Sequence, residues 1–353
     1  MVKKRILAAS ALLGSGFACA QSTVQLYGMV DLFVQHLGSG GRSLTQLADG
    51  GNGASRFGFR GAEDLGGGLA ANFVLEAGVN ADTGAGTLPG PSISFTRQAF
   101  VGLSGGWGRV DAGRMYTPMF NAFLRADPFG MNAIYSPLVL VAQTDAQPGL
   151  GPAPAFRASN MVRYRTPQGQ AFMLDLAYSF GEASTASKRS GEFQGGAIGY
   201  DKAPYYLAYS FSRTRTGTDT APVAAPVATR VDALSARIDL GQAWALSAHA
   251  IRVGGGLPST PAARLIDVGV SFQDGLSRWT GAVVQRKVGG STRGQFGVTL
   301  GYDYALSKRT VLYGRLLHLS NRGGATASAG GIAFTPRGGD AVRSSGIGIR
   351  HSF

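Results

Sequence analysis

Short segments of alternating hydrophobicity recur along almost the whole chain and constrain its fold more than any other feature. In the first of them, residues 24–35, apolar side chains fill most even positions, and Gln25, Asp31 and Gln35 are among the odd ones. Successive side chains of a β-strand point to opposite faces, so each segment has one apolar and one polar side. The alternation predicts an all-β protein built from many two-faced strands.

Turn-rich connections between these segments alternate between short and long. Seven are short: 62–68, 104–108, 166–170, 201–204, 239–243, 273–277 and 306–309. Eight are long: 37–54, 78–94, 115–156, 181–192, 212–230, 252–263, 286–292 and 319–340. Together they predict sixteen antiparallel strands with both termini on the short-turn side, and one missed hairpin would make the count fourteen or eighteen. So many hairpins in one domain disfavour the alternative, a soluble β-sandwich.

The N-terminus has the composition of a secretory signal peptide. Lys3, Lys4 and Arg5 precede an apolar run over residues 6–13, and Ala18-Cys19-Ala20 ends in the small residues typical of a cleavage site. We therefore expect residues 1–20 to be removed and residues 21–353 to form a single domain. Cys19 is the only cysteine, so the mature chain has no disulfide to stabilise it.

A transmembrane β-barrel is the architecture that fits this composition. After Gln21 there is no uncharged apolar run of 18 residues, only 44% of the chain is hydrophobic, and 54 residues are glycine. In lipid, only helices and closed barrels satisfy every backbone polar group. A barrel with short turns on the periplasmic side and long external loops is the expected form.

The basic charge is dispersed along the chain. Removal of the leader leaves 30 basic and 20 acidic residues, a formal charge of +10, and no block of five or more Lys/Arg occurs. A secreted chain meets no nucleic acid in its own compartment, so we expect no nucleic-acid partner. Dispersed positive charge on a barrel indicates the lumen and the rim.

The C-terminus supports the same architecture. Ile347, Ile349, His351 and Phe353 share one face of the last expected strand, and the chain stops on the aromatic residue. This resembles the terminal signal that the barrel-assembly machinery reads on outer-membrane proteins, with Phe353 as its key residue.

A series of motifs resembles the Gram-negative trimeric porins of the neisserial and β-proteobacterial type. The match runs nearly from end to end and is carried by residues 24–31 (VQLYGMVD), 55–68 (SRFGFRGAEDLGGG), 97–103 (RQAFVGL), 107–110 (WGRV) with 113–114 (GR), 159–164 (SNMVRY), 306–310 (LSKRT) and 348–353 (GIRHSF). Each motif alone is weak, but all of them in this order are specific.

The resemblance implies an outer-membrane homotrimer, with one water-filled channel per subunit for passive diffusion of small hydrophilic solutes. Outer-membrane lipid and lipopolysaccharide would surround it. The third long loop, 115–156, would fold into the barrel and narrow the pore. Wall arginines Arg56, Arg97 and Arg157 would face the loop acid Asp127 in this constriction.

The charge balance of that loop predicts a preference for anions. Its only acids are Asp127 and Asp145, and Arg125 adds a positive charge beside the first. Arginines that carboxylates balance only weakly should concentrate anionic solutes in a narrow pore.

Four other charged residues are expected to face the lumen: Arg60, Arg114, Asp31 and Glu76. Arg60 lies four residues after Arg56 and so shares its strand face. For Arg60, solvation of the lumen or pairing with Glu63 or Asp64 near the turn is the favoured role. Asp31 and Glu76 would balance the arginines.

Two other functions stay open. One is a solute-specific porin. The other is a barrel lipid hydrolase, for which His318 and Ser320 have the two-residue spacing that places base and nucleophile on one strand face. We expect no enzyme, because this spacing is common by chance. Scattered histidines and the absence of a phosphate-binding loop predict no metal or cofactor.

Overall fold

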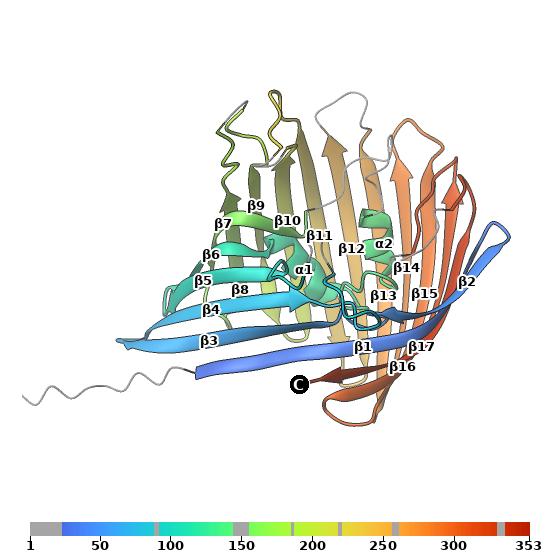
Figure 1. Ribbon diagram of the computed structural model, residues 1–353, viewed down its shortest axis with the longest axis horizontal. Coiled ribbons are helices and arrows are strands. Elements are labelled where there is room, and N and C mark those ends of the chain that lie inside the picture. The colour runs from blue at the N-terminus through green and yellow to red at the C-terminus, as the bar shows by residue number, and fades with distance from the viewer. Residues whose placement is uncertain are drawn as a thin grey trace, which may run out of the picture.

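The computed structural model describes residues 23–87, 92–143, 155–184, 187–217, 221–255, 261–329 and 336–353. Seventeen strand segments form one antiparallel sheet that closes into a barrel (Figure 1), because β1 (Thr23–Ser39) pairs with β17 (Val342–Ser352), the last strand. No helix among the described residues is long and apolar enough to cross a membrane.

The remaining strands follow one another around the barrel in chain order. Their bounds are β2 (Arg42–Asp49), β3 (Arg56–Gly66), β4 (Leu69–Gly78), β5 (Gln98–Gly105), β6 (Gly108–Tyr116), β7 (Arg157–Arg165), β8 (Phe172–Ser179), β9 (Phe193–Lys202), β10 (Tyr205–Arg215), β11 (Ala228–Leu240), β12 (Trp244–Gly255), β13 (Ala263–Asp274), β14 (Ser277–Val288), β15 (Gly294–Ala305) and β16 (Thr310–Arg322).

The predicted count of sixteen strands is confirmed, because β2 and β3 are two parts of one barrel strand. Both pair with β1: β2 along residues 32–39 of β1, and β3 along residues 23–29. Residues 50–55 interrupt this strand. All seven predicted short turns connect neighbouring strands.

The first long connection, predicted over 37–54, differs from the expectation. Its residues mostly extend β1 and β2, which are joined by a two-residue turn at Gly40 and Gly41. Both glycines have positive φ, 57° and 78°, the conformation that a tight two-residue hairpin requires. The irregular part is therefore only the interruption at 50–55.

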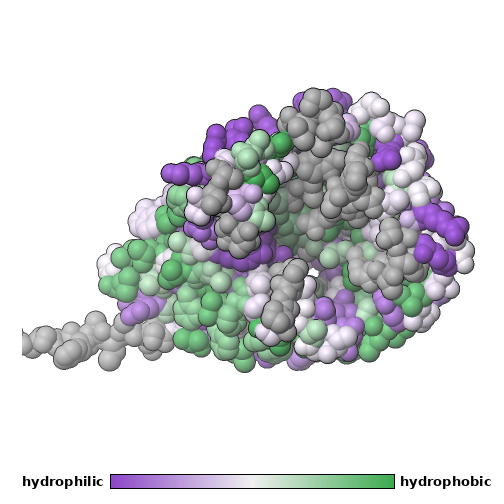
Figure 2. Space-filling model, turned by 45° about the horizontal axis from the view of Figure 1, so that its top comes forward, coloured by the Kyte–Doolittle hydropathy of each residue, from purple (hydrophilic) through white to green (hydrophobic). Residues whose placement is uncertain are grey.

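The outer face of the barrel is apolar, as the alternation predicts. Large hydrophobic side chains on it remain exposed, for example Val24, Leu26, Ile266 and Ile347. Figure 2 shows hydrophobic residues covering much of the outer wall and hydrophilic ones gathered toward the rim. This is the surface that a lipid bilayer covers.

The third long loop folds into the barrel and carries two helices, α1 (Pro118–Ala126) and α2 (Pro137–Gln143), both inside the barrel in Figure 1. Thr117 caps α1 by accepting a hydrogen bond from the amide of Phe120, and Pro118 occupies the first turn, where a missing amide hydrogen costs least. The position of the loop agrees with the expectation.

An apolar core fixes the loop to one half of the inner wall. Phe123 of α1 and Leu138 and Val141 of α2 are buried with inward-facing residues such as Ile251 and Val284. The helices contact β8 to β15. Strand alternation alone predicts that the whole inner face is in contact with water. On this half of the wall, however, the inner face is buried against the loop, so the water-filled path runs along the opposite half.

Candidate functional site

A cavity of about 690 Å³ lies in the lumen between the third loop and the wall. Eight of its lining residues are charged: Arg56, Arg97, Arg157, Arg278, Arg315, Arg350, Glu76 and Asp303. Six arginines against two acids give this lining a formal charge of +4. The loop contributes side chains such as Phe120, Leu124 and Phe129, and none of its described residues that line the cavity is acidic.

Glu76 organises the first group of arginines. The Nε atom of Arg97 lies 2.8 Å from Oε1 of Glu76, and Nε of Arg56 lies 3.7 Å from Oε2. The hydroxyl of Tyr27 also donates to Oε2, at 3.0 Å. One buried carboxylate thus holds two cations in place.

Tyr116, which the sequence did not single out, joins Arg97 to Arg157. Its hydroxyl accepts hydrogen bonds from Nη2 of Arg97 at 2.7 Å and from Nη2 of Arg157 at 2.8 Å. The Arg157 guanidinium also lies 4.4 Å from the centroid of the Tyr116 ring, which stacks on Phe120 of α1. The loop therefore positions the wall arginines through an aromatic residue instead of through a carboxylate.

A second group of arginines, also absent from the sequence prediction, comes from the C-terminal strands. Arg315 pairs with Asp303 at 2.7 Å. Arg350 donates to Oδ1 of Asn52 at 3.0 Å, and Asn52 donates to Asp303 at 2.6 Å. The strand alternation does indicate an inward position for Arg350, because Arg350 alternates with the outward-facing Ile347 and Ile349. It does not predict that Arg278 approaches the carbonyl oxygen of Pro128 in the loop.

Arg97 reaches the lumen although its strand parity favours the lipid face. Val101 and Leu103, which share that parity, are exposed on the outer wall. Arg97 precedes β5 and is hydrogen bonded through its backbone amide to Glu76. Because it lies outside the strand, the alternation does not fix its direction.

The structure places Asp127 and Arg125 away from the wall arginines. The Asp127 carboxylate is buried and accepts hydrogen bonds from the amides of Phe129 and Met131, at 3.1 and 2.6 Å, so it closes the turn after α1. Arg125 pairs with Asp201 at 2.8 Å. Neither residue lines the cavity, contrary to the expected opposition of loop acid and wall arginine. Asp145 lies outside the described residues.

Two of the four other charged residues expected in the lumen, Asp31 and Arg60, make contacts that differ from the expectation. Asp31 is fully buried and accepts hydrogen bonds from the amides of Asn52 and Gly53 and from the hydroxyl of Tyr313, so it anchors the interruption at 50–55. Arg60 donates to Gln25 and is exposed, rather than pairing with Glu63 or Asp64.

Arg114 lies at an irregularity of β6, where the register with β7 shifts between Gly113 and Met115. In the register with β5 it lies opposite Ala99, on the face of the exposed Val101. Its guanidinium donates to the carbonyl oxygen of Thr96 and to the hydroxyl of Ser159. Arg114 does not line the lumen cavity.

The terminal Phe353 closes the sheet. Its backbone amide and carbonyl pair with Gly28 of β1. A Cβ atom on Gly28 would lie 2.5 Å from the Phe353 ring, so the glycine makes room for the aromatic side chain.

His318 and Ser320 do lie close together. Their Nε2 and Oγ atoms are 3.0 Å apart. Within the described part of the chain, no carboxylate contacts the His318 ring, so the third group that orients a catalytic base is missing there. Nor do the described residues contain a group of three His, Cys, Asp or Glu that could hold a metal ion.

Comparison with known proteins agrees with this geometry. The family model described as Gram-negative porin matches residues 7–324. Outer membrane porin protein 32 of Delftia acidovorans is 31% identical over 373 residues, with all of both chains covered. The structure of an anion-selective porin from Comamonas acidovorans superposes with a TM-score of 0.83 and 28% identity, covering 94% of this chain and 100% of the other. OmpT of Vibrio cholerae in its trimer form shares the fold, with a TM-score of 0.67, 14% identity and coverage of 94% and 99%.

A closed barrel with an inward loop and a charged aqueous lumen defines a diffusion channel of the outer membrane. The chain belongs to the Gram-negative porin family.

Proposed function

We propose that this porin lets small hydrophilic solutes diffuse passively across the outer membrane and prefers anions. The observation that carries the proposal is the lining of the lumen cavity, in which six arginines face two acids. Fixed positive charge in a narrow channel with low-dielectric walls raises the local concentration of anions and lowers that of cations. The anion selectivity in the name of the similar Comamonas porin supports this assignment.

The pairing of the arginines leaves much of this charge uncompensated. Glu76 is shared by Arg56 and Arg97, and Asp303 pairs with Arg315. Arg157 has only the uncharged Tyr116 as its hydrogen-bond partner, and Arg350 has only the amide of Asn52, within the described residues. These two guanidinium groups are the candidates for direct contact with passing anions.

The test is the reversal potential of the purified protein in a planar bilayer under a potassium chloride gradient. We expect a potential displaced toward the chloride equilibrium value, and a smaller displacement for Arg157→Gln and Arg350→Gln. Cation preference would contradict the arginine assignment while leaving the channel intact, and absence of conductance would contradict the channel itself.

A homotrimer and a cleaved leader complete the proposal. The trimer rests on family resemblance and on the trimeric form of OmpT, and conductance closing in three equal steps would support it. Residues 1–20 lie outside the described residues, and a mature mass that begins at Gln21 would support cleavage after Ala20. Lipopolysaccharide and the barrel-assembly machinery, which would read Phe353, are the proposed partners in the membrane.

A further inference from the structure

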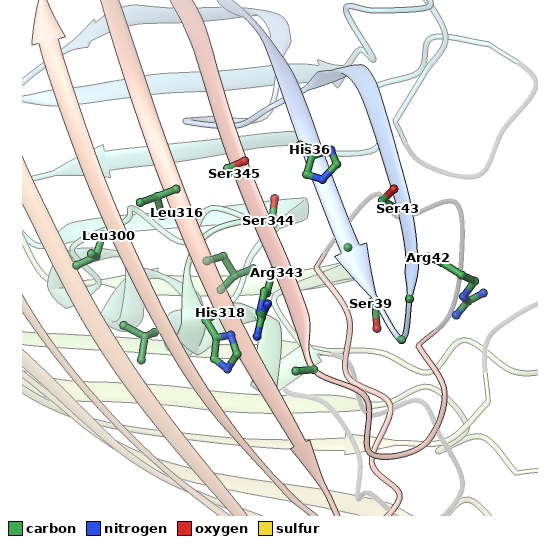
Figure 3. A pocket seen from close by; sticks show the side chains of 16 residues that line it. His36, Ser39, Arg42, Ser43, Leu300, Leu316, His318, Arg343, Ser344 and Ser345 are labelled. Atoms are coloured by element: carbon green, nitrogen blue, oxygen red, sulfur yellow. The ribbon is translucent and has the colours of Figure 1, made fainter.

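A polar groove of about 800 Å³ lies on the outer wall between the β1–β2 hairpin and strands β15 to β17. Figure 3 shows His318 and Arg343 side by side on neighbouring strands, with His36 and Ser43 across from them on the hairpin. His318 pairs in register with Arg343, and Leu316, on the same face, is 56% exposed. The groove therefore opens outward and not into the channel.

The groove has the charge of a site for an anion. Its lining includes Arg42, Arg343, His36 and His318 and no acid, and the carboxylate of Asp340 lies behind Gly40 at the end of the hairpin. Of the four serines that line it, Ser39 and Ser344 are buried, and Ser43 and Ser345 are more exposed. Arg343 is exposed and makes no ion pair with any described residue. An arginine that faces lipid is strongly disfavoured at mid-bilayer but tolerated near the interface, where a head group can neutralise it.

An apolar groove of about 890 Å³ continues from the polar one. The two share His36, Leu300, Leu316 and Ser345. The next row of cross-strand neighbours is Trp279, Tyr302, Gly314, Ile347, Val34 and Leu47.

This groove is deepened at Gly314, which has no side chain. A Cβ atom on Gly314 would meet no atom within 4 Å. The cleft is thus shaped by a glycine between large apolar neighbours.

We propose that the two grooves together bind one lipid of the outer leaflet that carries phosphate on its head group and several acyl chains. The guanidinium of Arg343 binds the phosphate through paired hydrogen bonds, and the imidazoles of His36 and His318 and the hydroxyls of Ser43 and Ser345 bind neighbouring oxygens. The acyl chains fill the groove over Gly314, where burial of apolar surface stabilises them. The inference rests on the outer-membrane location and is independent of ion selectivity, because its residues are on the outer wall.

Binding of diphosphoryl hexa-acyl lipid A to the purified full-length porin, measured by native mass spectrometry, tests the proposal. The charge variant combines Arg343→Gln with His318→Gln. The groove variant is Gly314→Phe, whose ring fills the apolar cleft without changing charge. We expect each to weaken lipid A binding at least tenfold, and we expect dephosphorylated lipid A to bind the wild type at least tenfold more weakly.

Arg264→Gln is the matched control. Arg264 is an exposed cation on the outer face of β13, opposite Arg252 and Lys287, and lines neither groove. We expect its binding to stay within twofold of the wild type. An equal loss in the control would mean general attraction to a basic surface and would overturn the site.

Unchanged lipid binding in both the charge variant and the groove variant would overturn the proposal. If the temperature of trimer dissociation also falls in these variants, a second copy of the chain covers the groove instead of a lipid. Conductance and reversal potential should match the wild type in all variants, so failure of the lipid site is distinguishable from failure of the channel.

Discussion

The Arg157 guanidinium contacts Tyr116 in two ways, because Nη2 donates a 2.8 Å hydrogen bond to the phenolic oxygen while the group lies 4.4 Å from the ring centroid. The same oxygen accepts from Arg97. Tyr116 immediately precedes the inward loop, and its ring stacks on Phe120 of α1. The loop and the charged wall are therefore mechanically connected through one aromatic side chain.

Tyr116→Phe separates these two contacts. The variant keeps the ring face but removes the acceptor for both arginines. We expect a loss of about 1.5 to 3 kcal/mol in the free energy of unfolding, the usual effect of losing a hydrogen bond to a charged group, measured by reversible urea unfolding in vesicles. Anion preference should persist, since the lining charge is unchanged. A stability equal to that of the wild type would contradict the bridging role.

Glu76→Gln removes one of the two acids of the cavity lining and raises its formal charge from +4 to +5. We expect the reversal potential to move further toward the chloride value, because Arg56 and Arg97 lose their shared counter-charge. Asp127→Asn is the control, since it removes an acid that is buried in the loop turn and does not line the cavity. Equal shifts in both variants would refute the different positions assigned to the two carboxylates.

Arg315→Gln tests the C-terminal group of arginines. We expect anion preference to fall, as for Arg157→Gln, because both side chains line the same cavity. Arg60→Gln provides the comparison: this exposed arginine binds Gln25 and does not line the cavity. The reversal potential of Arg60→Gln should stay at the wild-type value, and a shift as large as that of Arg315→Gln would count against the selective role of the lining.

Gly28→Ala tests how the barrel closes. The new Cβ atom would lie 2.5 Å from the Phe353 ring and 2.7 Å from the carbonyl oxygen of Arg56. We expect a destabilisation of about 1 to 3 kcal/mol from overpacking, read as a lower midpoint of urea unfolding. Gly314→Ala, whose Cβ would meet no atom within 4 Å, should be nearly neutral. Equal stability of the two variants would contradict the close approach of Phe353 to Gly28.

The sequence by itself determined the barrel. Period-two alternation and the seven short turns are local properties of the sequence, and a strand that faces lipid on one side and water on the other must place its apolar side chains on the lipid side. The same alternation placed Arg56 and Glu76 on the inner face, where the structure has them. It also indicates an inner-face position for Arg350, which alternates with the outward-facing Ile347 and Ile349.

Only the tertiary structure decided which charges meet in the lumen. The direction of Arg97 depends on its place before β5, and that of Asp127 on the turn after α1, where backbone amides take up the carboxylate. Tyr116 connects the loop to the wall arginines because Phe120 of α1 stacks on its ring. Strand parity fixes a face, whereas the contacts across a barrel depend on where a long irregular loop finds its apolar partners, and those partners come from strands far away in the sequence.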